Sequence, residues 1–296
     1  MVTATSPRLS TSWWQLTIEV LPKQEDVVYW RLEEFGCQGM AVVQGEGKIL
    51  AYVPVQRASW LDLAALSLRL RQDALIAGMP CPDLRWELLE SEDWANSWKQ
   101  YWQPQEVGDR LLICPAWTTP PVSNRLVIRM DPGMAFGTGT HPTTQLCLEA
   151  LEMRLDGTQG QVVADVGCGS GVLSLAAVKL GAAKVYAVDT DPLAVEATLE
   201  NRQLNQMREQ IWVKQGSLEH IPDMVDGLVC NILAETILDM IPAFRLVVKE
   251  KGWMILSGIL LDQAKIATEM LEAHDWMVSA LWKRGEWCCL NVRASG

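Results

Sequence analysis

Residues 162–171, VVADVGCGSG, decide the fold. An apolar strand ends at Asp165, and Gly167, Gly169 and Gly171 then turn the chain into a helix. Glycine is required where the backbone turns tightly and a ligand must approach it closely. The start of the following helix presents N–H groups and a positive dipole end, which favour an anion such as a carboxylate. The stretch therefore predicts a strand–turn–helix unit that binds a ligand.

The spacing of these glycines separates two classes of cofactor. Dinucleotide-binding loops read GxGxxG, whereas residues 165–171 read DxGxGxG. S-adenosylmethionine (SAM) contains no pyrophosphate, so it does not need the tighter cradle that a dinucleotide requires. We therefore favour SAM, and an NAD-dependent oxidoreductase is the disfavoured alternative.

The next predicted strand, residues 184–188, leads directly into Asp189. A carboxylate at the tip of a second strand can accept hydrogen bonds from both hydroxyl groups of a ribose. The alternative is that Asp189 or Asp191 caps the helix that begins at Pro192. Asp191 fits the position of the cap, and Asp189 fits the position of the ribose ligand.

A further short apolar strand, within residues 227–233 (GLVCNIL), carries Asn231 to the carboxyl edge of the sheet. Ligands bind at this edge in open α/β folds, and an amide side chain there can both accept and donate hydrogen bonds near a methyl acceptor. Asn231 could equally cap the following helix, and the sequence leaves both interpretations open.

The loop at residues 131–144, DPGMAFGTGTHPTT, precedes the sheet and enters a helix near Thr143. Its small and hydroxylated residues surround Phe136 and would allow it to fold over a cofactor. His141 is a candidate general base within this loop. We prefer a structural role for His141, because a single histidine beside a proline more often supports the local fold.

The first part of the chain has a different organisation. Strands and helices are predicted in the order strand–helix–strand–strand–helix–strand, at residues 13–20, 23–35, 39–44, 48–53, 57–77 and 83–89. This order is typical of the split βαβ or ferredoxin-like arrangement. It contains no catalytic constellation, so we expect a small α+β recognition domain. Trp94, Trp98 and Trp102 follow at helical spacing and predict an aromatic stripe on a linker helix.

The second part alternates helix and strand from about residue 141 to residue 258, as a doubly wound parallel sheet does. Residues 276–282 and 286–292 predict a terminal antiparallel hairpin, and strands at 110–114 and 125–130 are expected to pair. We predict an α/β Rossmann-like methyltransferase fold, mostly parallel with this hairpin. The predicted divisions are a recognition domain at 1–91, a helical linker at 92–108 and a SAM-dependent methyltransferase domain at 109–296.

Composition restricts the partners and the compartment. The formal net charge is −11, from 25 basic and 36 acidic residues, which disfavours direct binding to nucleic acid and is compatible with a basic protein partner. The eight cysteines form no CxxC pair, so we expect reduced thiols and no metal site. The beginning of the sequence has no apolar signal segment, and no stretch resembles a membrane span. We therefore expect a cytoplasmic protein.

These motifs together resemble the PrmA family, which methylates ribosomal protein L11. The resemblance rests on the loop at 131–144, on VADVGCGSGVLSLAAVKLGA and VYAVDTDPLAVEAT, on NIL at 231–233 and on LSGIL. It implies an N-terminal recognition domain, SAM as the cofactor, and methylation of lysine side chains and of the N-terminal amine. By similarity, Thr144, Gly167, Asp189 and Asn231 correspond to the SAM contacts of the family.

The residues after Asn231 are Ile232, Leu233 and Ala234, which depart from the NPPY-type motif of other amino- and amide-methyltransferases. This departure argues against glutamine or adenine as the acceptor. No Asp, Glu or His stands out as a required base, so we predict no indispensable catalytic residue. The alternatives are a methyltransferase for another protein or a small amine, and a module that binds SAM without turnover.

Overall fold

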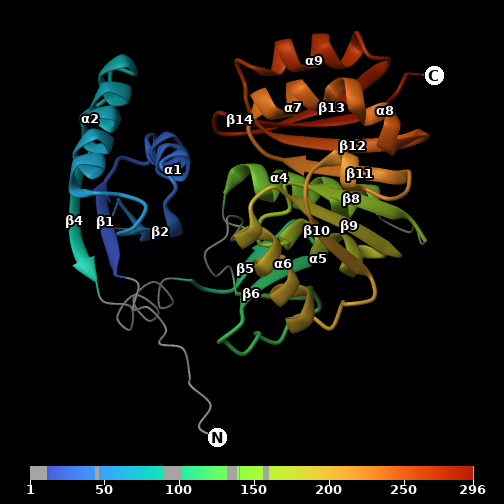
Figure 1. The fold of residues 1–296 in the computed structure, drawn as a ribbon, viewed down its shortest axis with the longest axis horizontal. Helices are drawn as coiled ribbons and strands as arrows, with labels where there is room; N and C mark the ends of the chain where they lie inside the picture. The colour runs from blue at the N-terminus through green and yellow to red at the C-terminus, as the bar shows by residue number, and fades with distance from the viewer. Residues whose placement is uncertain are drawn as a thin grey trace, which may run out of the picture. The chain divides into compact units, whose positions relative to one another are not determined.

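A computed structural model describes residues 12–43, 47–89, 102–131, 139, 141–155 and 160–295. The chain divides into two compact units, Met1–Gln103 and Pro104–Gly296 (Figure 1). Residues 92–101 of the expected linker helix, with Trp94 and Trp98, lie outside the described residues, as do residues 132–138 of the loop around Phe136.

The first unit contains the predicted series of six elements. They are β1 (Trp13–Glu19), α1 (Glu25–Glu34), β2 (Gln38–Val43), β3 (Lys48–Pro54), α2 (Trp60–Ile76) and β4 (Asp83–Leu89). The four strands form an antiparallel sheet in the order β2-β3-β1-β4. The assignment of this unit to the ferredoxin-like class stays a prediction that rests on this order.

Helix α2 shows how the sequence produces these elements. A capping box begins the helix: the Ser59 side chain accepts from the backbone N–H of Asp62, and the Asp62 side chain accepts from the backbone N–H of Ser59. These bonds satisfy N–H groups that have no partner within the first turn. Its buried residues recur at helical spacing, at Leu63, Leu66 and Leu70, so one face of the helix packs into the core of the unit.

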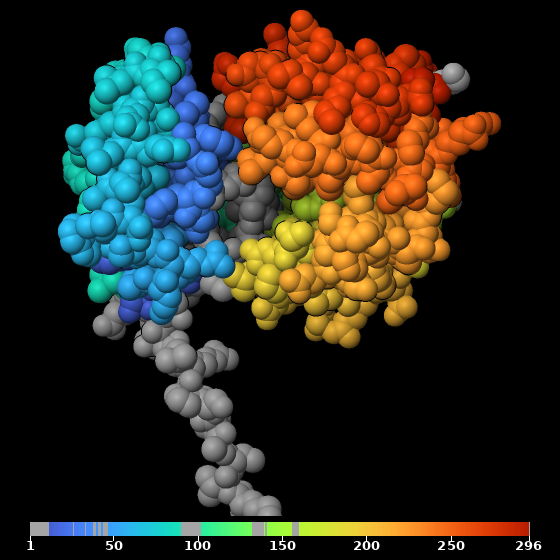
Figure 2. Space-filling model, turned by 45° about the horizontal axis from the view of Figure 1, so that its top comes forward, coloured from blue at the N-terminus to red at the C-terminus, as the bar shows by residue number. Residues whose placement is uncertain are grey.

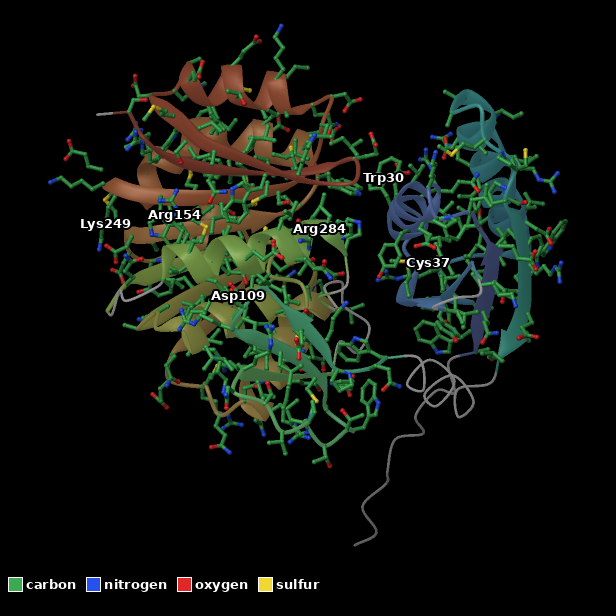
Figure 3. All side chains as sticks on the ribbon, turned by 180° about the vertical axis from the view of Figure 1, so that it is seen from behind. Trp30, Cys37, Asp109, Arg154, Lys249 and Arg284 are labelled. Atoms are coloured by element: carbon green, nitrogen blue, oxygen red, sulfur yellow. The ribbon has the colours of Figure 1, made fainter. Side chains whose placement is uncertain are left out.

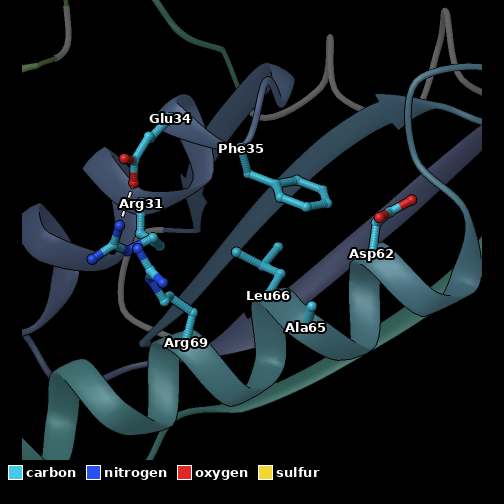
Figure 4. Close-up of a pocket in the computed structure, with 7 residues that line it drawn as sticks. All are labelled: Arg31, Glu34, Phe35, Asp62, Ala65, Leu66 and Arg69. Atoms are coloured by element: carbon cyan, nitrogen blue, oxygen red, sulfur yellow. Dashed lines mark hydrogen bonds and ion pairs between the residues drawn. The ribbon is translucent and has the colours of Figure 1, made fainter.

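Arg31 of α1 is joined to α2 by a two-pronged ion pair with Asp73, at 2.8 and 3.0 Å. It also pairs with Glu34 along its own helix. Beside this cluster lies a hollow of about 350 Å³ between the two helices. Phe35 and Leu66 are among the residues that line it (Figure 4). Charged side chains also line it, namely Arg31, Glu34, Asp62 and Arg69.

The second unit is the larger one, and a seven-stranded sheet in the order β10-β9-β8-β11-β12-β14-β13 runs through it. Its strands are β8 (Val162–Val166), β9 (Lys184–Asp189), β10 (Ile211–Gln215), β11 (Val225–Asn231), β12 (Val248–Leu260), β13 (Trp276–Arg284) and β14 (Trp287–Ala294). Its helices are α4 (Pro142–Arg154), α5 (Val172–Leu180), α6 (Pro192–Leu204), α7 (Ala234–Met240), α8 (Phe244–Val247) and α9 (Ala264–Glu272), with short 3₁₀ turns at Leu218–His220 and Ile241–Ala243.

The strands from β10 to β12 pair in parallel, whereas β14 pairs antiparallel with both β12 and β13. This is the predicted parallel sheet closed by a terminal hairpin. One face of the sheet packs against α7, α8 and α9 through alternate strand residues such as Val166, Cys230 and Leu256. The segments from α7 onward, orange to red in Figure 2, form a large part of the visible surface of this unit.

A smaller sheet of β5 (Gln105–Val107), β6 (Leu111–Pro115) and β7 (Leu126–Met130) packs against α4, α5 and α6 within the second unit. Strands β6 and β7 pair in parallel, which confirms the predicted pairing. Strand β5 lies at the end of residues 92–108, the segment expected to form a helical linker, so this end is a strand and not a helix. Arg284, labelled in Figure 3, joins the end of β13 to α4 through two contacts with Glu149, at 2.9 and 3.2 Å.

Two observations concern the described residues only. No helix among them is long and apolar enough to cross a membrane. No group of three or more His, Cys, Asp or Glu side chains among them is placed to hold a metal ion.

Candidate functional site

The register of three neighbouring strands brings the predicted site residues into one row. Val166, the last residue of β8, pairs with the residue before Asp189 on one side and with the residue before Asn231 on the other. Gly167, Asp189 and Asn231 therefore lie at the same level on the carboxyl edge of the sheet. Neighbouring strands are about 4.8 Å apart, so the row is short enough for one small ligand to contact all three residues.

The glycine loop between β8 and α5 has the backbone conformation that its sequence predicts. Gly167, Gly169 and Gly171 have positive φ angles of 74°, 53° and 83°. The N–H groups of Gly167 and Cys168 both donate to the carbonyl oxygen of Val188, which fastens the loop to β9. Gly171 caps α5 without a side-chain hydrogen bond, so the first turn of this helix presents N–H groups to an acceptor.

The Asp189 carboxylate accepts one backbone N–H on each oxygen, from Gly169 and from Asp191, both at 2.9 Å. Burial raises the pKa of this carboxyl, while the backbone hydrogen bonds lower it. Each carboxylate oxygen has a second lone pair, so Asp189 can still accept from ligand hydroxyl groups. Asp191 caps α6 by accepting from Leu193 N at 2.9 Å, which confirms its predicted role.

Asp165 lies beneath the glycine loop and is completely buried. Ser174 Oγ donates to its Oδ2 at 2.6 Å, and its Oδ1 has no hydrogen-bond partner among the described residues. Burial, opposed by the bonds from Ser174, raises the pKa of Asp165 to about 7. The sequence places Asp165 at the end of a strand but contains no local signal for this state.

Asn231 is the last residue of β11, and its side-chain nitrogen donates to Thr144 Oγ1 at 3.2 Å. Thr144 is fully buried in the first turn of α4. Helix α7 is capped by Leu233 rather than by Asn231, so the interpretation of Asn231 as a helix cap is wrong. The structure thus brings two of the predicted site residues into direct contact.

His141 is the N-cap of α4 and is buried. Its Nδ1 lies 2.7 Å from Thr143 Oγ1, and its ring meets the edge of Trp287 with ring centres 5.1 Å apart. Burial lowers the pKa of His141 to about 4, so the imidazole is neutral near pH 7. These contacts agree with the structural role that we preferred for it.

Asn201 is a site residue that the sequence analysis missed. It lies on the buried face of α6, and its side chain both donates to and accepts from the backbone of Asp131, at 2.8 Å each way. It also donates to the carbonyl oxygen of Ser170 at 2.9 Å. Asn201 therefore joins the start of the 131–144 loop to the glycine loop. Asn201 shares the buried face of α6 with Ala194 and Ala197. A polar residue at helical spacing from two buried alanines is the sequence signal that could have indicated its role.

The family described as ribosomal protein L11 methyltransferase (PrmA) matches residues 12–295. The chain belongs to this family. An L11 methyltransferase of Thermosynechococcus vestitus is 54% identical over 95% of this chain and 97% of its own length. That of Synechococcus elongatus is 43% identical over 95% and 97%. A solved L11 methylase of Lactobacillus delbrueckii subsp. bulgaricus is 34% identical and has a TM-score of 0.62. The match covers 66% of this chain and 100% of that one.

Membership of the L11 methyltransferase family confirms the predicted resemblance and the SAM-dependent methyltransferase class. The solved L11 methylase and the sheet order together confirm the Rossmann-like fold of the second unit. The specific contacts of Thr144, Gly167, Asp189 and Asn231 with the cofactor stay predictions.

Proposed function

We propose that this protein transfers methyl groups from SAM to amino groups of ribosomal protein L11, at lysine side chains and at the N-terminal amine. The observation that carries the proposal is the row of Gly167, Asp189 and Asn231 on one sheet edge in a chain of this family. The L11 methyltransferases that it resembles over almost their whole length give the acceptor protein.

The residues present fit SAM. Asp189 keeps acceptor capacity for two ribose hydroxyls, and the positive-φ backbone at Gly167 allows close approach of a ligand to the loop. The start of α5 suits the methionine carboxylate. Oδ1 of Asp165, which has no hydrogen-bond partner among the described residues, lies beneath the same loop. The positive sulfonium of a bound SAM would favour the charged form of this carboxyl.

The cofactor supplies a methyl group activated by its sulfonium, and the protein must present a neutral amine in line with it. Deprotonating an ordinary lysine at pH 7 costs about 4.6 kcal/mol, whereas an N-terminal amine costs only about 1 kcal/mol. Partial removal of water from the lysine, close to the positive sulfonium of SAM, lowers the free-energy cost of deprotonating the lysine.

Asn231 is placed to orient that amine. Its side-chain nitrogen is engaged by Thr144, so its Oδ1 faces away from this bond and can accept from an amine N–H. His141 is a poor base, because its pKa is held near 4. We propose that Asn231 and neighbouring backbone carbonyls position the amine and that no side chain acts as an indispensable proton acceptor.

The ferredoxin-like unit at residues 1–91 is proposed to recognise the ribosomal protein. The net charge of −11 suits a basic protein partner and disfavours direct contact with nucleic acid phosphates. We place the reaction in the cytoplasm, with no membrane involved.

Mass spectrometry of purified L11 after incubation with the protein and isotopically labelled SAM tests the proposal. We expect mass additions in steps of one methyl group, on lysine-containing peptides and on the N-terminal peptide. An equal mixture of ribosomal proteins serves as the competitor. Labelling of a different protein while L11 stays unmodified would overturn the assignment of the acceptor.

A further inference from the structure

We propose that Gly258 is a positioning residue for methyl transfer, which acts by fixing the backbone that follows Asn231. This inference rests on the proposed function and deepens it. Gly258 lies in β12, at a point where the pairing of β12 with β14 shifts register between Ser257 and Ile259. Its φ angle is +85°, which side chains of L residues rarely adopt.

The lack of a side chain at Gly258 allows a very close approach to Ile232. A Cβ atom at this position would lie 2.0 Å from the carbonyl oxygen of Ile232, 2.7 Å from its carbonyl carbon and 3.1 Å from its nitrogen. All three are backbone atoms, which cannot turn aside as the end of a flexible side chain can. The main chain immediately after Asn231 therefore packs directly on the main chain of β12.

Gly167 holds the same residue from a second direction. Its φ angle is +74°, and a Cβ atom there would lie 2.2 Å from Cγ2 of Ile232. Ile232 is thus fixed by its backbone against one glycine and by its side chain against another. A substitution at Gly258 cannot be relieved simply by moving Ile232 towards the glycine loop.

Strand β12 is held in place beside Gly258, so we expect an added Cβ to displace the acceptor segment, residues 231 and 232, rather than β12. Ser257, the pairing partner of Asn231 in the sheet, is fully buried and donates to the carbonyl oxygen of Cys288 at 2.9 Å. This bond fastens β12 to β14 beside Gly258. A displacement is therefore transmitted to Ile232 and to the neighbouring Asn231, whose Oδ1 we assign to the amine.

The size of the expected effect follows from the distances. Real Cβ atoms essentially never come within 3.0 Å of another heavy atom, so Gly258→Ala requires a shift of about 1 Å at Ile232. A misplacement of about 1 Å can reduce the rate of an oriented reaction roughly 100-fold. Asp189 lies at the end of β9, on the far side of β8 from β11, so the proposed ribose contact is kept and SAM affinity should fall much less than kcat, although Asn231 is itself a predicted SAM contact.

The test compares Gly258→Ala with Gly160→Ala. Gly160 also has a φ angle of +85°, but an added Cβ there would meet no atom of the described residues within 4 Å, so the pair separates the contact from the backbone strain. With L11 and saturating SAM, we expect kcat of Gly258→Ala to be roughly 100-fold below that of Gly160→Ala. Calorimetry should give SAM Kd values for the two variants that agree within about tenfold, a difference of about 1.4 kcal/mol.

Two results would overturn the inference. One is an equal kcat in the two glycine variants, and the other is a loss of SAM affinity as large as the loss of kcat. A wild-type protein that fails to methylate L11 would instead refute the proposed function, so the two failures are distinguishable.

A second variant covers the case in which Gly258→Ala does not fold. Ile232→Ala adds no atom but removes the side chain that rests against Gly167, so the acceptor segment loosens. We expect kcat to fall by about tenfold or more, with a smaller relative change in SAM Kd, and Ile232→Val, which keeps Cγ2, to restore most of the kcat. Equal kcat values for Ile232→Ala and Ile232→Val would count against the role assigned to this contact.

Discussion

The amide of Gly169 donates to Oδ2 of Asp189 over 2.9 Å, a bond that joins the glycine loop after β8 to the tip of β9. One carboxylate therefore orders the loop and lies where the ribose is expected. Because the neighbouring Asp191 has a separate task as the cap of α6, the two acids can be tested against each other.

Asp189→Ala should weaken SAM binding by roughly 10- to 100-fold, because hydrogen bonds to a charged group contribute about 1.5–3 kcal/mol. Isothermal titration calorimetry measures the change in Kd. Asp191→Ala is the matched control, and it should cost about 1 kcal/mol of stability through the lost cap while leaving the Kd nearly unchanged. Equal losses of SAM affinity in both variants would contradict the role of Asp189.

Asp165 should make the stability of the free protein fall as the pH rises. Its pKa is about 7 in the folded state and near 3.8 ordinarily, so between these values the folded state binds the proton and the unfolded state has lost it. The free energy of unfolding contributed by this group therefore decreases from about pH 4 to about pH 7.

Urea unfolding of wild type and Asp165→Asn at pH 5 and pH 8, without SAM, measures this contribution. The variant cannot titrate, so its stability relative to wild type should be higher at pH 8 than at pH 5. A difference between the two proteins that does not depend on pH would show that Asp165 is charged in the fold over this whole range.

His141→Ala should retain substantial methyl transfer, because the neutral imidazole caps α4 and packs on Trp287 rather than accepting a proton. The loss should appear in stability instead, at about 1 kcal/mol for the cap. His141→Asn, which supplies a capping oxygen in place of the Nδ1 acceptor, should recover part of that stability. The methyl-transfer rate and the melting temperature should be measured for both variants. Near-total loss of transfer with SAM still bound would show that His141 is catalytic.

Arg31→Lys should destabilise the first unit, because an ammonium group cannot reproduce the two-pronged contact with Asp73. The Arg31 side chain is only 13% exposed, so the lost contact is poorly replaced by water, and we expect about 1 kcal/mol. Arg85→Lys is the control, since Arg85 is 70% exposed where it pairs with Asp83. Thermal melting should shift clearly for the first variant only; equal shifts would refute the argument.

Features that depend on neighbouring residues were predictable from the sequence. The turn at Gly167–Gly171, the cap at Asp191 and the terminal hairpin all follow from local chemistry, since positive φ angles, side-chain capping and alternation are set within a few residues. The hairpin is longer than predicted, with β13 continuing to Arg284, because the ends of strands depend on pairing rather than on local pattern.

Features that depend on distant contacts were not predictable. The role of Asn231 stayed open because its partner Thr144 is 87 positions away. The protonation of Asp165 depends on how completely the fold buries it, and the approach of Ile232 to Gly258 depends on the bulge in β12. Strand β5 lies within the expected linker and forms because it pairs with β6. A strand of only three residues is too short to show an alternating pattern in the sequence.

Strand β14 comes last along the chain, yet it lies between β12 and β13 in the sheet. During synthesis, β13 therefore emerges before the strand that will attach it, and β12 keeps an open hydrogen-bonding edge until Trp287 and its successors arrive. A chain interrupted ahead of β14 would display that unpaired edge, which is a template for aggregation. Closure of this sheet therefore waits for β14, because this one strand pairs with both β12 and β13.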